Sequence, residues 1–118
     1  MKRVVLGAAA LSFVLAGCAT IPLPAEELER THSTIRSAEV LGAEQVPTAK
    51  LHLQFAKDEQ ANAKNLAARG DERALTLLSC AQADADLAVV LANEAQVRQQ
   101  AIQAAQDVST LRQRGTKP

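Results

Sequence analysis

The feature that most constrains this chain is a run of apolar residues, mostly alanine, repeated at alternating spacings of four and three in its C-terminal part. The repeating positions are Ala74, Leu78, Ala81, Ala85, Ala88, Ala92 and Ala95, which we call the alanine seam. Residues 71–114 contain no glycine or proline, so one helix can run through them without interruption. Apolar residues at these spacings form one side of a coiled-coil helix, and small ones allow axes to approach to the lower end of the usual range of about 8–10 Å. The seam therefore predicts a long helix packed closely against a partner helix.

The segment before Gly70 supplies a matching partner. Its apolar stripe consists of Ala49, Leu53, Ala56, Ala63, Leu66 and Ala67. Pro47 suits the first turn of this second helix, which should run to about Arg69, and Asp71 is a good N-cap for the third helix. The short Gly70-Asp71 connection makes the two helices antiparallel. At about 1.5 Å per residue they are ~34 Å and ~62 Å long, so the third helix must extend beyond the second.

A shorter helix is predicted ahead of this hairpin, from Ala25 to about Leu41. Leu28, Ile35 and Ala38 share one face of it. Acidic residues crowd its opening turn, where the helix dipole favours them, and Gly42 suits a left-handed terminus. We therefore expect an all-α fold: an antiparallel, coiled-coil-like helical hairpin with a shorter N-terminal helix and a long C-terminal helix.

A second apolar stripe runs along the opposite side of the third helix. Its members are Ala83, Leu87, Val90, Val97, Ala101, Ala104, Val108 and Leu111, interrupted by Glu94. Its offset of two residues from the alanine seam corresponds to about 200° around the helix. We expect the first helix to cover the beginning of this second stripe. Beyond the end of the second helix, we expect Val97, Ala101, Ala104, Val108 and Leu111 to bind a partner protein or another copy. The alternative is a frayed, solvated helix end, or cover by the first helix.

The N-terminal segment has the parts of an export signal. Lys2 and Arg3 precede an apolar stretch over residues 4–14, which is shorter than the roughly 20 residues of a membrane span. The following Leu15-Ala16-Gly17-Cys18 resembles the lipobox of bacterial lipoproteins. That resemblance implies a diacylglyceryl group on the Cys18 thiol, cleavage before it, and acylation of the new amino group. The alternative is an ordinary signal peptide with a chance cysteine.

The expected organisation follows from this reading. Residues 1–17 are a lipoprotein signal peptide, 18–24 the lipidated cysteine and a tether with two prolines, 25–114 the helical domain, and 115–118 a tail. Several acyl chains anchor a protein firmly where one chain holds it only marginally. Ala19 stands where some lipoproteins carry an aspartate that retains them in the inner membrane, so we expect an outer-membrane protein facing the periplasm.

Charge and aromatic content argue against nucleic acid as a partner. Loss of Lys2 and Arg3 with the signal leaves 11 basic against 13 acidic residues, whereas nucleic-acid binding calls for a basic surface. Phe55 is the single aromatic residue after the signal, which leaves no stacking platform for bases.

Cys80 has no partner for an intramolecular disulfide if Cys18 is lipidated. We expect it to be a small buried apolar residue, with pairing to a second chain in an oxidising compartment as the alternative.

No residue pattern predicts an enzyme, a cofactor or a metal. His32 and His52 lack metal-ligand spacing. Asp84 and Asp86 are two residues apart on a helix and point away from one another, so we expect them to solvate the flanks of the seams.

The pattern as a whole resembles the alanine-rich bacterial envelope domain known as domain of unknown function 4398. The matching residues are Ile35, Ala38, Gly42-Ala43, Val46-Pro47, Leu53, Ala56, Gly70, Ala74, Leu77 and the run Ala83-Asp84-Ala85-Asp86-Leu87-Ala88. They cover about Glu26 to Glu94. The resemblance implies a helical lipoprotein or exported protein and supplies no catalytic residues. Many members continue into an OmpA-like domain that binds peptidoglycan, and we expect the resemblance here to cover the helical domain without it.

Two functions remain in view. The first is a structural or adaptor lipoprotein that binds an envelope protein, or itself, through its helical seams. The second is attachment to peptidoglycan, by analogy with the small murein lipoprotein that is joined to the cell wall through a C-terminal lysine. Lys117 is followed by Pro118 here, which departs from that terminus.

Overall fold

The computed structural model describes residues 20–115, and they form helices joined by short turns. The elements are α1 (Ala25–Val40), a 3-10 turn η1 (Ala43–Gln45), α2 (Pro47–Ala68) and α3 (Arg73–Gly115). The segment predicted to be a signal peptide, Cys18 and Lys117 lie outside the described residues. Within them the all-α prediction is confirmed.

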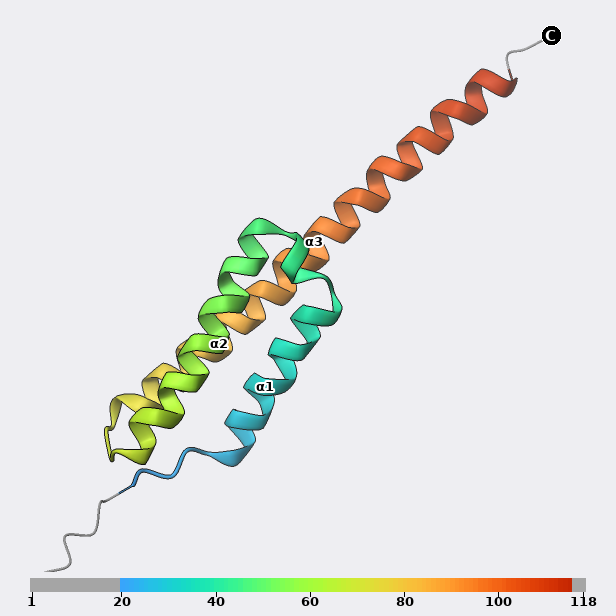
Figure 1. Cartoon of the computed structure of the whole chain (residues 1–118). Helices are drawn as coiled ribbons and strands as arrows, with labels where there is room; N and C mark the ends of the chain where they lie inside the picture. The colour runs from blue at the N-terminus through green and yellow to red at the C-terminus, as the bar shows by residue number, and fades with distance from the viewer. Residues whose placement is uncertain (1–19, 116–118) are drawn as a thin grey trace, which may run out of the picture.

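The three helices share a body from which α3 projects (Figure 1). α1 and α2 lie alongside the first half of α3, and α2 runs antiparallel to both neighbours. With 43 residues against 22 in α2 and 16 in α1, α3 continues alone well past the body. The predicted hairpin with a shorter first helix and a long last helix is therefore confirmed.

The helix ends lie close to the positions predicted from glycine and proline. Gly42 follows α1 with φ of 80°, and Gly70 follows α2 with φ of 73°. Both values fall in the left-handed region that glycine adopts without strain. Pro47 opens α2. Asp71 Oδ1 accepts a hydrogen bond from the Arg73 backbone N–H at 3.0 Å, which gives the start of α3 its side-chain cap.

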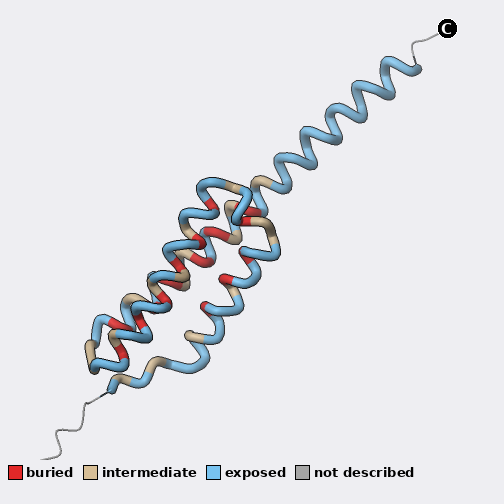
Figure 2. The backbone as a smooth tube through the Cα atoms, viewed as in Figure 1, coloured by how far each residue is buried: buried red, intermediate tan, exposed pale blue. Residues whose placement is uncertain are grey.

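The core follows the alanine seam (Figure 2). Every seam residue from Ala74 to Ala92 is buried, and Ala95 is half-buried. α2 contributes buried Ala49, Leu53, Ala56, Ala63 and Ala67, and α1 contributes Thr31, Ile35 and Ala38. Both shorter helices thus converge on one side of α3, because methyl groups leave space for two neighbours.

One buried position was missed by the apolar pattern. Gln60 lies between Ala56 and Ala63 on α2 and is 8% exposed. Its Nε2 donates to the Leu28 carbonyl of α1 at 3.4 Å. At this position a hydrogen bond between α2 and α1 therefore takes the place of an apolar contact.

The expectation that α1 covers the beginning of the second stripe is wrong. Gln82 Nε2 donates to Thr34 Oγ1 at 3.2 Å, and Gln96 Nε2 donates to the Leu41 carbonyl at 2.8 Å. These contacts place α1 over the flank of α3 next to the alanine seam. Leu87 therefore remains exposed on the far side of α3.

Candidate interaction surface

The second stripe of α3 is exposed along its whole length. The exposed fractions of its large side chains are 39% at Leu87, 59% at Val90, 64% at Val97, 49% at Val108 and 64% at Leu111. The alanines between them, at positions 83, 101 and 104, are exposed as well. Contiguous apolar surface of this kind marks an interaction site more often than a scatter of single residues does. The predicted partner-binding residues therefore belong to a longer open face that begins within the body.

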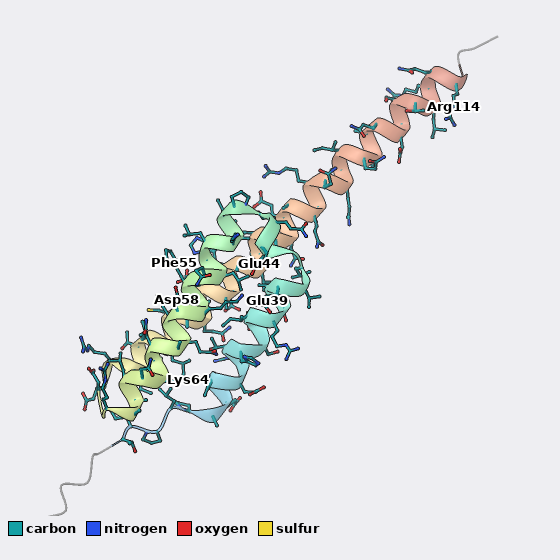
Figure 3. All side chains as sticks on the ribbon, in the orientation of Figure 1. Glu39, Glu44, Phe55, Asp58, Lys64 and Arg114 are labelled. Carbon is teal, nitrogen blue, oxygen red and sulfur yellow. The ribbon has the colours of Figure 1, made fainter. Side chains whose placement is uncertain are left out.

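We call residues 96–115 of α3 the overhang; its first residue, Gln96, still contacts the body through the Leu41 carbonyl. Every residue of the overhang is exposed (Figure 2). Near its base, Arg98 donates to Glu94 Oε1 at 2.5 Å, an i,i+4 pair that supports the helix. Figure 3 shows Arg114 at the tip, far from the labelled side chains of the body.

The N-terminal tether lies at the end of the body opposite the overhang (Figure 1). The Ile21 N–H donates to the Ala67 carbonyl at 2.9 Å, next to the turn that joins α2 to α3. One of the last carbonyls of α2 is satisfied in this way. The chain therefore enters the body at the α2–α3 turn and leaves it through the overhang at the other end.

Cys80 is exposed, so the expectation that it is buried is wrong. It precedes Ala81 of the alanine seam by one residue, which is a rotation of about 100° away from the core. With Leu66 and Leu77 it borders an open groove of about 400 Å³ between α2 and α3. The thiol is accessible to other molecules.

The expectation that Asp84 is a solvated residue beside the seam is wrong. Its Oδ1 lies 2.7 Å from His52 Nδ1 on α2, and both side chains are about three-quarters buried. Phe55 packs edge-on against the His52 ring with centroids 6.2 Å apart. Asp86, by contrast, is exposed as expected.

Glu59 adds a second carboxyl to this cluster. Burial raises its pKa above the usual value, and the charge of Asp84 together with a hydrogen bond to it raises the pKa further. His52 and Glu59 are one heptad apart on α2, and this repeat was the signal in the sequence that α2 presents both to the same flank of α3. Their arrangement links two helices.

A charged contact fastens α2 to the end of α1. Lys57 Nζ lies 2.6 Å from Glu39 Oε1 and 3.4 Å from Glu44 Oε1. The hydrogen bond to Glu39 is the main reason that the pKa of Lys57 rises, against partial desolvation. Figure 3 shows Glu39 and Glu44 close to one another at the side of α2. These ion pairs join α2 to α1 and η1 near the end of the body from which the overhang extends.

Within residues 20–115, no group of three or more histidine, cysteine or acidic side chains is placed to hold a metal ion. By length and composition α3 is the one described helix apolar enough to cross a membrane, a test that packed core helices also pass. Its alanine seam is packed against α1 and α2.

Comparisons with protein-family models, with curated proteins and with solved structures found no match to this chain. The resemblance to domain of unknown function 4398 stays a prediction.

Proposed function

We propose that this chain is a lipid-anchored spacer of a bacterial envelope that holds an interaction helix away from the membrane. The observation that carries the proposal is that the tether and the overhang lie at opposite ends of the body. Cys18, the residue that resembles a lipidation site, precedes Ile21 by three positions. An acyl anchor there holds the α2–α3 turn next to the bilayer and directs the overhang away from it.

The length of α3 sets the reach of such a spacer. Its 43 residues span ~64 Å at about 1.5 Å per residue. The overhang accounts for about 30 Å of that length. The exposed side chains from Val97 to Leu111 therefore stand several tens of ångströms from the anchored end, within reach of proteins that are not themselves on the membrane surface.

The character of the exposed face favours a protein as the partner. Valine and leucine recur on one side of the overhang, and glutamine dominates elsewhere. An amphipathic helix of this kind binds by laying its apolar side against another helix or a groove. Because Ala19 follows Cys18, the outer membrane, with the body facing the periplasm, is the location we propose.

The anchor is tested by the mass of the mature N-terminal peptide. We expect a diacylglyceryl group and a further acyl chain on Cys18, and Cys18→Ser should move the protein out of the membrane fraction. An unmodified N-terminus and an unchanged membrane fraction in Cys18→Ser would overturn the proposal.

The interaction helix is tested by photocrosslinking in intact envelopes. A photoreactive residue at Val108 should give a discrete crosslinked protein, whereas the same residue at Gln106, on the opposite side of α3, should not. Equal labelling from both positions, or none, would remove the adaptor role.

Muropeptide digestion tests the alternative function. An adduct on Lys117 would replace the adaptor proposal by covalent attachment to peptidoglycan. Unmodified Lys117 together with a crosslink at Val108 supports the adaptor.

A further inference from the structure

The exposed second stripe follows a seven-residue register that begins earlier than its first alanine and is interrupted at Glu94. Cys80 precedes Ala83 by three residues and is exposed. One core position of the heptad is occupied by Cys80, Leu87, Glu94, Ala101 and Val108. The other core position is occupied by Ala83, Val90, Val97, Ala104 and Leu111. We call these the a and d positions, following coiled-coil usage.

We propose that this face binds a second copy of the chain, with the two α3 helices forming a parallel two-stranded coiled coil from Cys80 to Leu111. This inference rests on the proposed function in that it names the partner of the interaction helix. The register spans more than four heptads, and Glu94 is the one charged residue among its core positions. The helix that presents it is continuous through every one of those positions.

The extent of the exposed surface favours a parallel partner over an antiparallel partner confined to the overhang. Leu87 and Val90 lie within the body, yet they remain 39% and 59% exposed because α1 and α2 pack on the other side of α3. A parallel partner in equal register covers both residues as well as the overhang. An antiparallel partner that overlaps the overhang alone leaves Leu87 uncovered.

The charges beside the seam also favour the parallel arrangement. In parallel coils, the residue before an a position faces the residue after a d position of the partner, five places further along the chain. Asp107 and Arg112 hold these two positions, so the symmetric dimer contains two such pairs, in each of which the carboxylate of one copy faces the guanidinium of the other. In an antiparallel arrangement that overlaps the overhang, each residue before an a position faces a residue before an a position of the partner. This places Asp107 opposite Gln100.

Glu94 limits the strength of the dimer. It takes an a position and meets its symmetry mate across the seam, while Arg98 of the same helix lies against it. The last heptad, with Val108 at a and Leu111 at d, has the combination that favours two strands.

The test is oxidative crosslinking of the full chain in bacterial envelopes with copper phenanthroline. The oxidant removes two electrons and two protons from a pair of thiols to form the disulfide. We expect Cys80 to give a species of twice the mass on a non-reducing gel, and Cys80→Ser to abolish it. In the Cys80→Ser background, Val108→Cys should restore the product, and Gln106→Cys on the outer side should not.

Three results would overturn the proposal. One is the absence of any dimer from both Cys80 and Val108→Cys. Another is a dimer from Cys80 without one from Val108→Cys, because the copies then do not share the seam to its end. The third is a crosslink between Val97→Cys and Val108→Cys chains without a Val108→Cys homodimer, which indicates the antiparallel arrangement.

Sedimentation of the purified lipoprotein in detergent gives an independent measure. Glu94→Leu should lower the dimer Kd at least about tenfold, whereas Gln106→Leu, which adds the same side chain on the outer face, should leave it unchanged. An unchanged Kd in Glu94→Leu would contradict the seam. If lipidation at Cys18 fails, sedimentation of the unlipidated chain with Glu94→Leu or Gln106→Leu still tests the seam, so the two proposals fail separately.

Discussion

His52 Nδ1 lies 2.7 Å from Asp84 Oδ1 and joins α2 to α3 at the edge of the alanine seam. Glu59 shares this site, and its raised pKa has desolvation as the first cause and Asp84 as the second. Replacing Asp84 by Asn should therefore lower the pKa of Glu59 toward its usual value without restoring it fully. Asp86→Asn, two residues further along α3, should leave it unchanged. A carboxyl-carbon NMR titration measures both, and equal effects would contradict the assignment.

Glu59→Gln should stabilise the body at neutral pH. Because the folded-state pKa of Glu59 is raised, its proton is held more tightly in the folded state, and ionisation as pH rises through that pKa costs stability. The gain at pH 7 should be up to about 1 kcal/mol, the scale of partly exposed charge interactions. It should vanish below the unfolded pKa, where wild type is protonated in both states.

Denaturant unfolding at pH 7 and pH 4 checks this prediction. Asp58→Asn is the matched control, since Asp58 is exposed on the same helix and its change should stay within about 0.5 kcal/mol at both pH values. A loss of stability in Glu59→Gln at pH 7 would show that the charged carboxylate contributes to the fold.

Asp71 should contribute stability with the opposite pH dependence. Its hydrogen bonds with Arg73 lower its pKa from 3.8 to about 2. A carboxylate with a depressed folded pKa stabilises the fold above its unfolded pKa, and this contribution disappears as pH falls through the folded value. Asp71→Asn should therefore lower Tm at pH 7, and the difference from wild type should shrink between pH 4 and pH 2.

Thermal unfolding at a series of pH values measures this difference. Glu72→Gln removes a neighbouring exposed carboxylate and should show no such trend. A difference between Asp71→Asn and wild type that is constant down to pH 2 would indicate that the charge has no part in capping α3.

Gly42→Ala should destabilise the body through backbone strain alone. Gly42 has φ of 80°, and an added Cβ would meet no atom within 4 Å. The left-handed conformation costs a non-glycine residue about 1–2 kcal/mol. Gly115→Ala also meets no atom and should change stability by less than about 0.5 kcal/mol. Denaturant midpoints compare the two, and equal values would mean that the α1–η1 turn relaxes.

Ala85→Leu should separate the helices of the body. Ala85 is fully buried in the alanine seam, and extra methylenes in a closely packed core cost about 1–3 kcal/mol. Ala61→Leu adds the same side chain on the exposed side of α2 and should be nearly neutral. Chemical denaturation followed by circular dichroism distinguishes them, and a stabilised Ala85→Leu protein would show that the seam has unfilled space.

The elements of this fold were predictable because glycine, proline and alanine act locally. Gly42, Pro47 and Gly70 fix the helix ends through backbone conformation, and the alanine spacing fixes which side of α3 is buried. These signals depend on residues within one or two turns of the chain. They required no knowledge of how distant segments pack.

The errors arose where a helix flank meets a second helix. Periodicity shows that Asp84 lies beside the seam, but whether it is solvated depends on His52 reaching across from α2. Cys80 was expected to be buried from residue type alone, although its angular position is off the seam. Gln60 was missed because a polar residue is buried there through a hydrogen bond to α1. The outcomes at Asp84 and Gln60 depend on the rotation of neighbouring helices, which a single-helix pattern does not contain, whereas the exposure of Cys80 follows from its spacing to the seam.

The alanine seam has a thermodynamic consequence for the body. Unfolding a core lined mainly by methyl groups exposes less hydrocarbon to water than unfolding one built from leucine or phenylalanine, and the heat capacity increment scales with that exposure. Its value per residue should fall below the ~12–15 cal/mol/K typical of globular domains. The stability curve of the body is therefore shallow, and a modest free energy of folding persists with little change from cold to warm conditions.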